Sequence, residues 1–387
     1  RCRLTGAALV LGSATPDLCT YYKALQGECT HLHLTSRPNG AALPKVEIVD
    51  MRQELEARNF SVLSRALQQA LVMTAAAGEQ AIVLLNRRGY STFVMCRDCG
   101  QTITCPHCAV AMVYHKKNED LRCHYCGNTM PLPQGCPNCH SRRIKYFGSG
   151  TQKAEEQLQQ LPEVRVLRMD QDSTVAKFAH ADILRRFAGG AANVLIGTQM
   201  VAKGHDIPNV TLVGVLAADS TLHLPDYRAS ERAFSLLTQA AGRAGRGDRP
   251  GHVIFQTYDP DNPILQLAVT QDYDTFAKRE LQERKNYFYP PFAQMLKLQV
   301  VDKDEGAGLA LAQQVVFYLQ SLKLQGKLED LLIAGPFPSL VAKAYDLYRF
   351  NVLLKARDLR ETKEALLNSE FKEKPNLYFN VDPVSVI

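Results

Sequence analysis

The stretch VLIGTQMVAKGHDIPNVTLVGVLA, residues 194–217, decides the fold class of this chain. It holds two short apolar runs, Val194–Gly197 and Leu212–Ala217, with a polar loop between them. Near-continuous apolar runs that end in turns are typical of strands buried on both faces of a parallel sheet. The stretch therefore predicts a parallel α/β sheet, with the polar loop at the carboxyl end of one strand.

The same pattern recurs along the chain on both sides of this stretch. Further strand-like runs are Val46–Asp50, Ala81–Leu85, Val164–Met169 and His252–Thr257. Amphipathic segments that we expect to be helices lie between such runs, at Ser61–Thr74, Gln152–Gln160 and Phe178–Phe187. Alternating strands and helices predict a doubly wound α/β domain over residues 16–258.

A second domain is expected over residues 259–387. A turn-rich segment at residues 258–263 precedes a charged helix, Asp272–Tyr289. The elements expected after it are strands at Met295–Val301, Leu331–Ile333, Arg349–Lys355 and Asn376–Val381, and helices at Gly308–Leu322 and Leu359–Leu367. The order β-α-β-β-α-β predicts a ferredoxin-like α+β domain.

Four Cys-x-x-Cys pairs interrupt the α/β pattern over residues 96–147. They are Cys96/Cys99, Cys105/Cys108, Cys123/Cys126 and Cys136/Cys139, which hold eight of the eleven cysteines. Four pairs supply the ligands for two four-thiolate zinc sites, and a disulfide cluster is the alternative. The spacing favours nested pairing of the inner two and the outer two, and leaves crossed pairing open. His107, His115, His124 and His140 are expected to lie on the surface or beside the sites rather than to bind metal.

Composition fits a globular chain of two or three domains. The 387 residues are 46% hydrophobic with a formal net charge of +6, and no run is long enough to span a bilayer. We find no signal peptide, so a cytoplasmic protein without a membrane partner is expected. The chain starts at Arg1 rather than Met, which indicates a piece of a longer protein. The mild positive charge is compatible with nucleic acid.

Two motifs have the chemistry of a nucleotide site. In the segment LTQAAGRAGR, residues 237–246, helical spacing would place Gln239, Arg243 and Arg246 on one face, and Gly242 would let a phosphate approach. A solvated basic face is the alternative. The loop at residues 197–210 offers Thr198, Gln199 and Lys203 to phosphates, and Asp206 to a ribose or an arginine.

These segments resemble motifs of superfamily 2 helicases. GTQMVAKGHDIPNV at residues 197–210 looks like motif V, LTQAAGRAGR like motif VI, and LGSATP at residues 11–16 like motif III. NRRGY at residues 86–90, AADSTLHLPDYRASER at residues 217–232 and the cysteine array narrow the resemblance to the primosomal, replication-restart family of these DNA helicases.

The resemblance implies an ATP-dependent 3′ to 5′ DNA helicase that recognises stalled or branched forks and starts primosome assembly. Residues 16–95 and 148–258 would form the second RecA-like lobe, residues 1–15 a remnant strand of the first lobe, and residues 259–387 a DNA-binding domain. Forked or single-stranded DNA, single-stranded-DNA-binding protein and other primosome proteins would be the partners, in the bacterial cytoplasm and nucleoid.

The resemblance also assigns roles to single residues. Gln239, Arg243 and Arg246 would act on ATP; Gly204, Asp206 and Gly242 would line the nucleotide cleft; Thr198, Gln199 and Lys203 would lie near DNA; the eight paired cysteines would hold two Zn2+. The chain lacks a Walker A motif and a DE-x-H motif, so the Mg2+ ligands are expected in a first lobe that precedes it, and the chain alone should not hydrolyse ATP.

Other readings stay open. A non-catalytic zinc-ribbon module that binds DNA or protein is one, and an RNA helicase or other translocase is another. On the expected helix Asp272–Tyr289, DNA-binding candidates are Lys278, Arg279, Arg284 and Lys285, but Glu280 and Glu283 lie among them and favour a solvated helix. The aromatic run Tyr287–Phe292 is expected to plug a domain interface.

Overall fold

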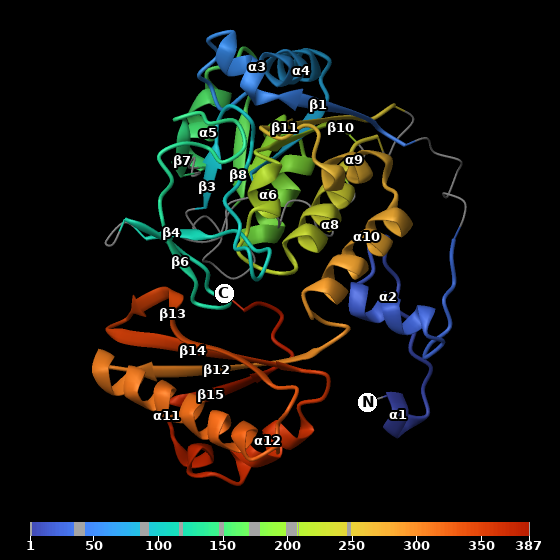
Figure 1. Cartoon of the computed structure of the whole chain (residues 1–387). Helices are drawn as coiled ribbons and strands as arrows, with labels where there is room; N and C mark the ends of the chain where they lie inside the picture. Colours follow the sequence, from blue (N-terminus) through green and yellow to red (C-terminus); the bar gives the residue numbers. More distant parts are fainter. Residues whose placement is uncertain are drawn as a thin grey trace.

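The chain forms two sheet domains with a small cysteine-rich module between them, in a computed structural model (Figure 1). The structure describes residues 2–34, 43–85, 93–115, 119–146, 151–169, 179–198, 207, 209–245 and 249–386. No helix among these residues is long and apolar enough to cross a membrane.

The first domain is built on a six-stranded sheet in the order β1-β11-β10-β2-β9-β8, with every neighbouring pair parallel. Its strands are β1 (Lys45–Asp50), β2 (Gln80–Leu85), β8 (Val166–Met169), β9 (Val194–Gly197), β10 (Val210–Leu216) and β11 (His252–Thr257). All six predicted strands are confirmed, with ends that move by at most two residues.

Helices cover both faces of this sheet. One face carries α4 (Arg65–Ala76) and α5 (Thr151–Gln159), and the other carries α2 (Leu18–Leu25), α6 (Ala179–Ala188) and α8 (Ala229–Ala241). Successive strand residues point to opposite faces, so Val83 lies in the core with α4 and Leu84 in the core with α6. This double cover explains why the strands are apolar at nearly every position.

The helices α9 (Pro263–Thr270) and α10 (Tyr273–Asn286) also pack on the parallel sheet. Leu265 and Phe276 belong to the same buried cluster as the strand residues, and the Phe276 ring stacks on Phe234 with centroids 4.2 Å apart. Both helices follow the expected domain boundary at residue 259 in sequence, yet they bury their apolar faces against the first domain. The second sheet starts only at Gln294.

The second domain has the predicted β-α-β-β-α-β order. Its elements are β12 (Gln294–Asp302), α11 (Glu305–Leu324), β13 (Leu332–Ala344), β14 (Leu347–Ala356), α12 (Arg360–Leu367), a short 3-10 helix (Glu370–Glu373) and β15 (Leu377–Val381). The antiparallel sheet order β13-β14-β12-β15 is that of a ferredoxin-like fold.

Two expectations about strands were wrong. β13 is much longer than the predicted Leu331–Ile333, because it continues past two prolines by shifting register and turns into β14 through Tyr345 and Asp346, both with positive φ. In residues 1–15 the structure has a short helix, α1 (Cys2–Thr5), and no strand within the described part. Residues Leu9–Leu11 are exposed, as expected for an apolar segment without a sheet to join.

Candidate zinc centres and motor-site residues

Each Cys-x-x-Cys pair folds into the same tight turn. The residue after each pair has a positive φ, and its amide donates to the carbonyl oxygen of the first cysteine at 2.9 to 3.0 Å. These residues are Gly100, Ala109, Gly127 and His140. The turn brings both thiols of a pair to one side, which is the geometry a metal knuckle needs.

The four knuckles combine in the nested arrangement. Cys96, Cys99, Cys136 and Cys139 form one group, and Cys105, Cys108, Cys123 and Cys126 form the other, with all four sulfurs of a group within 4.8 Å. The Sγ atoms of Cys96 and Cys139 are 3.6 Å apart, and those of Cys99 and Cys136 are 3.5 Å apart. A tetrahedral zinc with bonds of about 2.3 Å separates its sulfurs by about 3.8 Å, so both groups fit Zn2+. All eight cysteines are free of disulfides.

Short antiparallel strands support each group. For the outer group these are β3 (Val94–Cys96) and β7 (Ile144–Tyr146), and for the inner group β4 (Val113–His115), β5 (Asp120–Arg122) and β6 (Thr129–Pro131). The four histidines lie outside both groups. His124 is buried and its Nδ1 lies 3.1 Å from the carbonyl oxygen of Pro338, and burial lowers its pKa to about 4. His124 therefore contacts the C-terminal sheet as a neutral ring.

Tyr289 joins three parts of the molecule. Its hydroxyl donates to the carbonyl oxygen of Cys108 at 3.1 Å, and its ring stacks on Tyr227 of the first domain with centroids 4.9 Å apart. The Lys355 ammonium of β14 lies 4.3 Å from the same ring, and Tyr125 of the inner knuckle meets it edge-on. The predicted role of the 287–292 run as an interface plug is confirmed for Tyr289, which is buried.

A buried ion-pair network lies beside this junction. Glu231 on α8 accepts from the guanidinium groups of Arg228 at 2.8 Å and Arg284 at 2.9 Å. Arg228 also pairs with Asp17, the N-cap residue of α2, and Arg284 pairs with Glu280 at 3.2 Å. Arg284 is 1% exposed, so it is neither a DNA contact nor part of a solvated helix face, and both readings of the sequence are wrong for this residue. The carboxylates of Glu231 and Glu280 are buried with Arg284, and its positive charge offsets the cost of removing them from solvent.

The residues of the motif VI segment do not share one helix. The helix α8 ends at Ala241, with Gly242 as its C-cap, so the helical spacing expected for Gln239 and Arg243 is not kept. Gln239 Nε2 donates to Ser235 Oγ at 2.9 Å, and Ser235 Oγ lies 2.9 Å from Thr15 Oγ1. The described residues thus connect the LGSATP segment directly with the helix that carries Gln239.

Both glycines of this segment have a structural setting. Gly245 has a positive φ, and a Cβ there would come within 2.3 Å of the Gly251 nitrogen, so close backbone packing requires it. A Cβ at Gly242 would make only ordinary contacts, the nearest at 3.5 Å. Packing alone therefore explains Gly245 and does not explain Gly242.

The loop after β9 is only partly described. Thr198 follows β9 directly and is 8% exposed. Gln199, Lys203, Gly204, Asp206 and Arg246, together with the NRRGY segment, lie outside the described residues.

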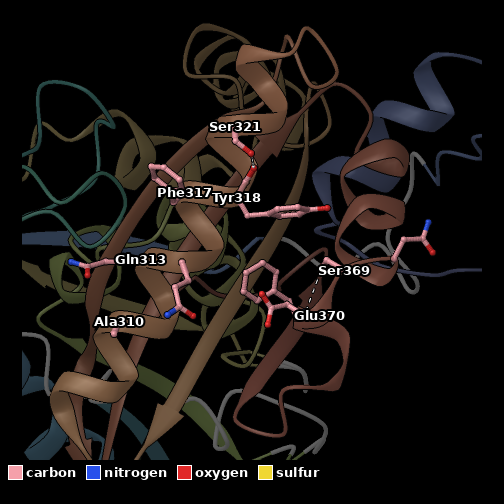
Figure 2. Close-up of a pocket in the computed structure, with 10 residues that line it drawn as sticks. Ala310, Gln313, Phe317, Tyr318, Ser321, Ser369 and Glu370 are labelled. Carbon is pink, nitrogen blue, oxygen red and sulfur yellow. Dashed lines mark hydrogen bonds between the residues drawn. The ribbon is translucent and has the colours of Figure 1, made fainter.

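One pocket lies on the helical side of the C-terminal domain, between α11 and the segment after α12 (Figure 2). It has a volume of about 920 Å3, and Phe317, Gln313 and Glu370 are among its lining residues. No basic residue lines it, so it does not fit the phosphates of a nucleotide.

The sequence did not predict the buried ion-pair network around Glu231. Asp17 and Glu231 are separated by 214 positions in the chain, and no local pattern connects them. The only signal was the density of charge in the segment at residues 217–232, which holds both Arg228 and Glu231.

Family models match three parts of the chain. The PriA DNA helicase Cys-rich region (CRR) domain matches residues 105–131, the helicase conserved C-terminal domain matches residues 137–248, and the primosomal protein N C-terminal domain matches residues 285–384. Together with the parallel sheet, these matches confirm the predicted fold class: a second helicase lobe with an inserted double zinc-binding module and a C-terminal α+β domain.

Curated relatives match the chain over most of its length. The replication restart protein PriA of Bacillus subtilis (strain 168) is 47% identical over 348 residues, which are 90% of this chain and 43% of that protein. The proteins of the same name from Synechocystis sp. and Chlamydia muridarum are 42% and 36% identical, over 92% and 100% of this chain. The chain spans about half the length of these relatives, 43% and 52% of the latter two.

Proposed function

Because the chain corresponds to the C-terminal region of PriA-type replication restart proteins, we propose that it forms the second motor lobe of an ATP-dependent DNA helicase that moves 3′ to 5′. The observation that carries this proposal is the hydrogen-bonded path from Thr15 through Ser235 to Gln239. It ties the motif III segment, at the border with a first lobe, to the motif VI helix that faces ATP in this class of motor.

Three groups of residues would perform the motor's work. Gln239, Arg243 and Arg246 would neutralise charge on the ATP phosphates, with Gly204, Asp206 and Gly242 lining the same cleft. Thr198, Gln199 and Lys203 would meet the DNA backbone. Arginine suits the phosphate role because its planar guanidinium offers two parallel hydrogen bonds and keeps its charge.

The two zinc ions would have a structural rather than a catalytic role. Each group supplies four thiolates, which leaves no open coordination position for a substrate. Mg2+ and the ATP phosphates would be held by a first lobe in the longer protein, where Mg2+ offsets phosphate charge during hydrolysis.

Forked or single-stranded DNA is the proposed substrate, at stalled or branched replication forks. Single-stranded-DNA-binding protein and other primosome proteins are the proposed partners, within the bacterial cytoplasm and nucleoid. These proposals rest on the similarity to proteins that are named for replication restart.

The test joins this chain to a first lobe and measures DNA-stimulated ATP hydrolysis. Arg246→Ala is expected to lower the rate by at least roughly a hundredfold, the scale of an arginine that stabilises transition-state charge. Arg249→Ala is the matched control, because Arg249 is largely exposed and its guanidinium pairs with Glu79. An unchanged rate for Arg246→Ala would refute the motor role, and ATP hydrolysis by the 387-residue chain alone would refute its dependence on a first lobe.

The kind of nucleic acid is tested separately. Hydrolysis by the joined protein is expected to respond to single-stranded DNA and much less to RNA of the same sequence. Equal stimulation by RNA would favour the general translocase reading.

A further inference from the structure

A pocket of about 360 Å3 opens at the carboxyl edge of the parallel sheet. Leu85, Leu216 and Gln256, at or near the ends of β2, β10 and β11, line it. Arg97 of the first zinc knuckle and Lys153 of α5 line it too. Parallel α/β sheets bind ligands outside the carboxyl ends of their strands, and the volume lies within the usual range for small-ligand sites.

The lining has the chemistry of a nucleotide site. Among the described residues, the lining includes two cations, Arg97 and Lys153, two aromatic rings, Phe60 and Tyr258, and no acidic side chain. The Arg97 guanidinium lies 5.0 Å from the centroid of the Tyr258 ring, and Phe60 is 72% exposed. Exposed rings stack on bases and nearby cations attract phosphates, whereas a carboxylate would repel them.

The wall that carries Phe60 is held in place by two glutamines. Gln256 Nε2 donates to the Val62 carbonyl oxygen at 2.8 Å, and its Oε1 accepts from the Ser64 amide at 2.7 Å. Gln157 Oε1 accepts from Ser61 Oγ and from the Val62 amide, both at 2.9 Å. The loop before α4 is therefore ordered before a ligand arrives, which lowers the entropic cost of binding.

The opposite wall is also fixed. The Tyr258 amide donates to the buried carboxylate of Asp219 at 2.7 Å. A Cβ at Gly100 would lie 2.5 Å from the Tyr258 carbonyl oxygen, so the first zinc knuckle sits directly against this strand end. That contact places Arg97 of the zinc module at a pocket of the motor lobe.

We propose that this pocket binds one base of a single DNA strand, with Phe60 stacking on the base and with Arg97 and Lys153 meeting the flanking phosphates. The site is separate from Thr198, Gln199 and Lys203, and it gives the outer zinc knuckle a direct contact with DNA. The inference rests on the proposed function in one respect, that DNA is the nucleic acid.

The experiment measures binding of the 387-residue chain, loaded with zinc, to labelled oligothymidylate and to an abasic strand of equal length. Phe60→Ala is expected to weaken binding to oligothymidylate by roughly five- to a hundredfold, the scale of one lost base stack, and to leave abasic binding unchanged. Phe60→Tyr keeps a ring and should retain affinity. Lys153→Ala should weaken both strands and reduce the salt dependence by about one phosphate contact.

Met73→Ala is the control for Phe60→Ala, because Met73 is 64% exposed near the end of α4 in the first domain. Lys45→Ala, at an exposed lysine at the start of β1, matches Lys153→Ala. Neither control should change affinity for either strand. Unfolding temperature and zinc content are compared first, and exposed Phe60 is expected to leave both unchanged.

Two results would overturn the proposal. They are an equal loss of abasic and thymidylate binding in Phe60→Ala, and no binding by the unmutated chain. The Arg246→Ala assay of ATP hydrolysis is independent of these measurements. If Phe60→Ala does not act as expected while Arg246→Ala lowers ATP hydrolysis, only the pocket proposal fails. If Arg246→Ala leaves hydrolysis unchanged while Phe60→Ala weakens DNA binding as expected, only the motor proposal fails.

Discussion

Thr15 Oγ1 lies 2.9 Å from Ser235 Oγ, across 220 positions of sequence. Ser235 also accepts from Gln239 Nε2 at 2.9 Å, so one hydroxyl connects the LGSATP segment with a residue of motif VI. We therefore expect that movement of the segment at Thr15 is passed through the Ser235 hydroxyl to Gln239, the side chain that is proposed to meet ATP.

Ser235→Ala should break this connection. In the protein joined to a first lobe, we expect DNA-stimulated ATP hydrolysis to fall by roughly five- to tenfold, the equivalent of about one lost hydrogen bond, while zinc content and unfolding temperature stay the same. Ser321→Ala on α11 serves as the control, since the Ser321 hydroxyl donates to the carbonyl oxygen of Tyr318 in its own helix. A rate equal to that of the unmutated protein would show that the hydrogen bonds of Ser235 to Thr15 and Gln239 do not affect ATP hydrolysis.

Removing Arg284 should destabilise the first domain strongly. Arg284→Ala leaves Glu231 and Glu280 buried near each other without their shared cation, and broken buried pairs cost about 3–5 kcal/mol. Urea unfolding followed by circular dichroism measures this loss. Arg279→Ala, one turn away on the exposed side of α10, should change stability by less than about 0.5 kcal/mol. Similar losses in the two variants would mean that the network adds no stability.

Glu280 should make stability depend on pH near neutrality. The pKa of Glu280 is raised to about 7, mainly by burial and also by the nearby charges of Glu283 and Glu231, while Arg284 acts to lower it. The folded state therefore prefers the protonated carboxyl, so the stabilising contribution is present at low pH and is lost as pH rises through 7.

Glu280→Gln removes that titration. Between about pH 6 and pH 8 the unmutated chain should lose about 1 kcal/mol more stability than the variant, measured by urea unfolding with zinc present. Parallel pH profiles for the two proteins would place the titration elsewhere in the molecule.

The two zinc sites should differ in what they hold together. The inner cysteines belong to a buried cluster with Tyr289, Met295 and Phe337, whereas Cys139 of the outer group is exposed. Cys123→Ser should therefore loosen the C-terminal sheet, seen as faster amide exchange along β12. Cys139→Ser should leave that sheet protected and open only the ends of the module.

Zinc analysis accompanies both variants. The unmutated chain should carry two zinc ions and each variant about one, because a missing thiolate opens one site only. Equal exchange along β12 in the two variants would contradict the assigned difference.

The parallel sheet was predictable because its strands are buried on both faces, which leaves a local signature in every strand. β13 was not, since Pro336 and Pro338 interrupt its pattern and only the pairing with β14 reveals it. The cysteine spacing was compatible with nested and with crossed pairing, and the distances between the sulfurs show the nested arrangement. Arg284 sits in a charged helix, so only the contact with Glu231 shows that it is interior.

The pairing of Val94 with Tyr146 has a consequence for how the module is joined to the rest of the chain. The cysteine module begins and ends at the paired strands β3 and β7, and the outer zinc group brings these two ends together. The nested arrangement suits an inserted segment, because the first and last cysteine pairs share one zinc group and so hold the two ends of the segment together. The order of the six strands therefore does not depend on the module, and a short turn at this place would be compatible with the same parallel sheet.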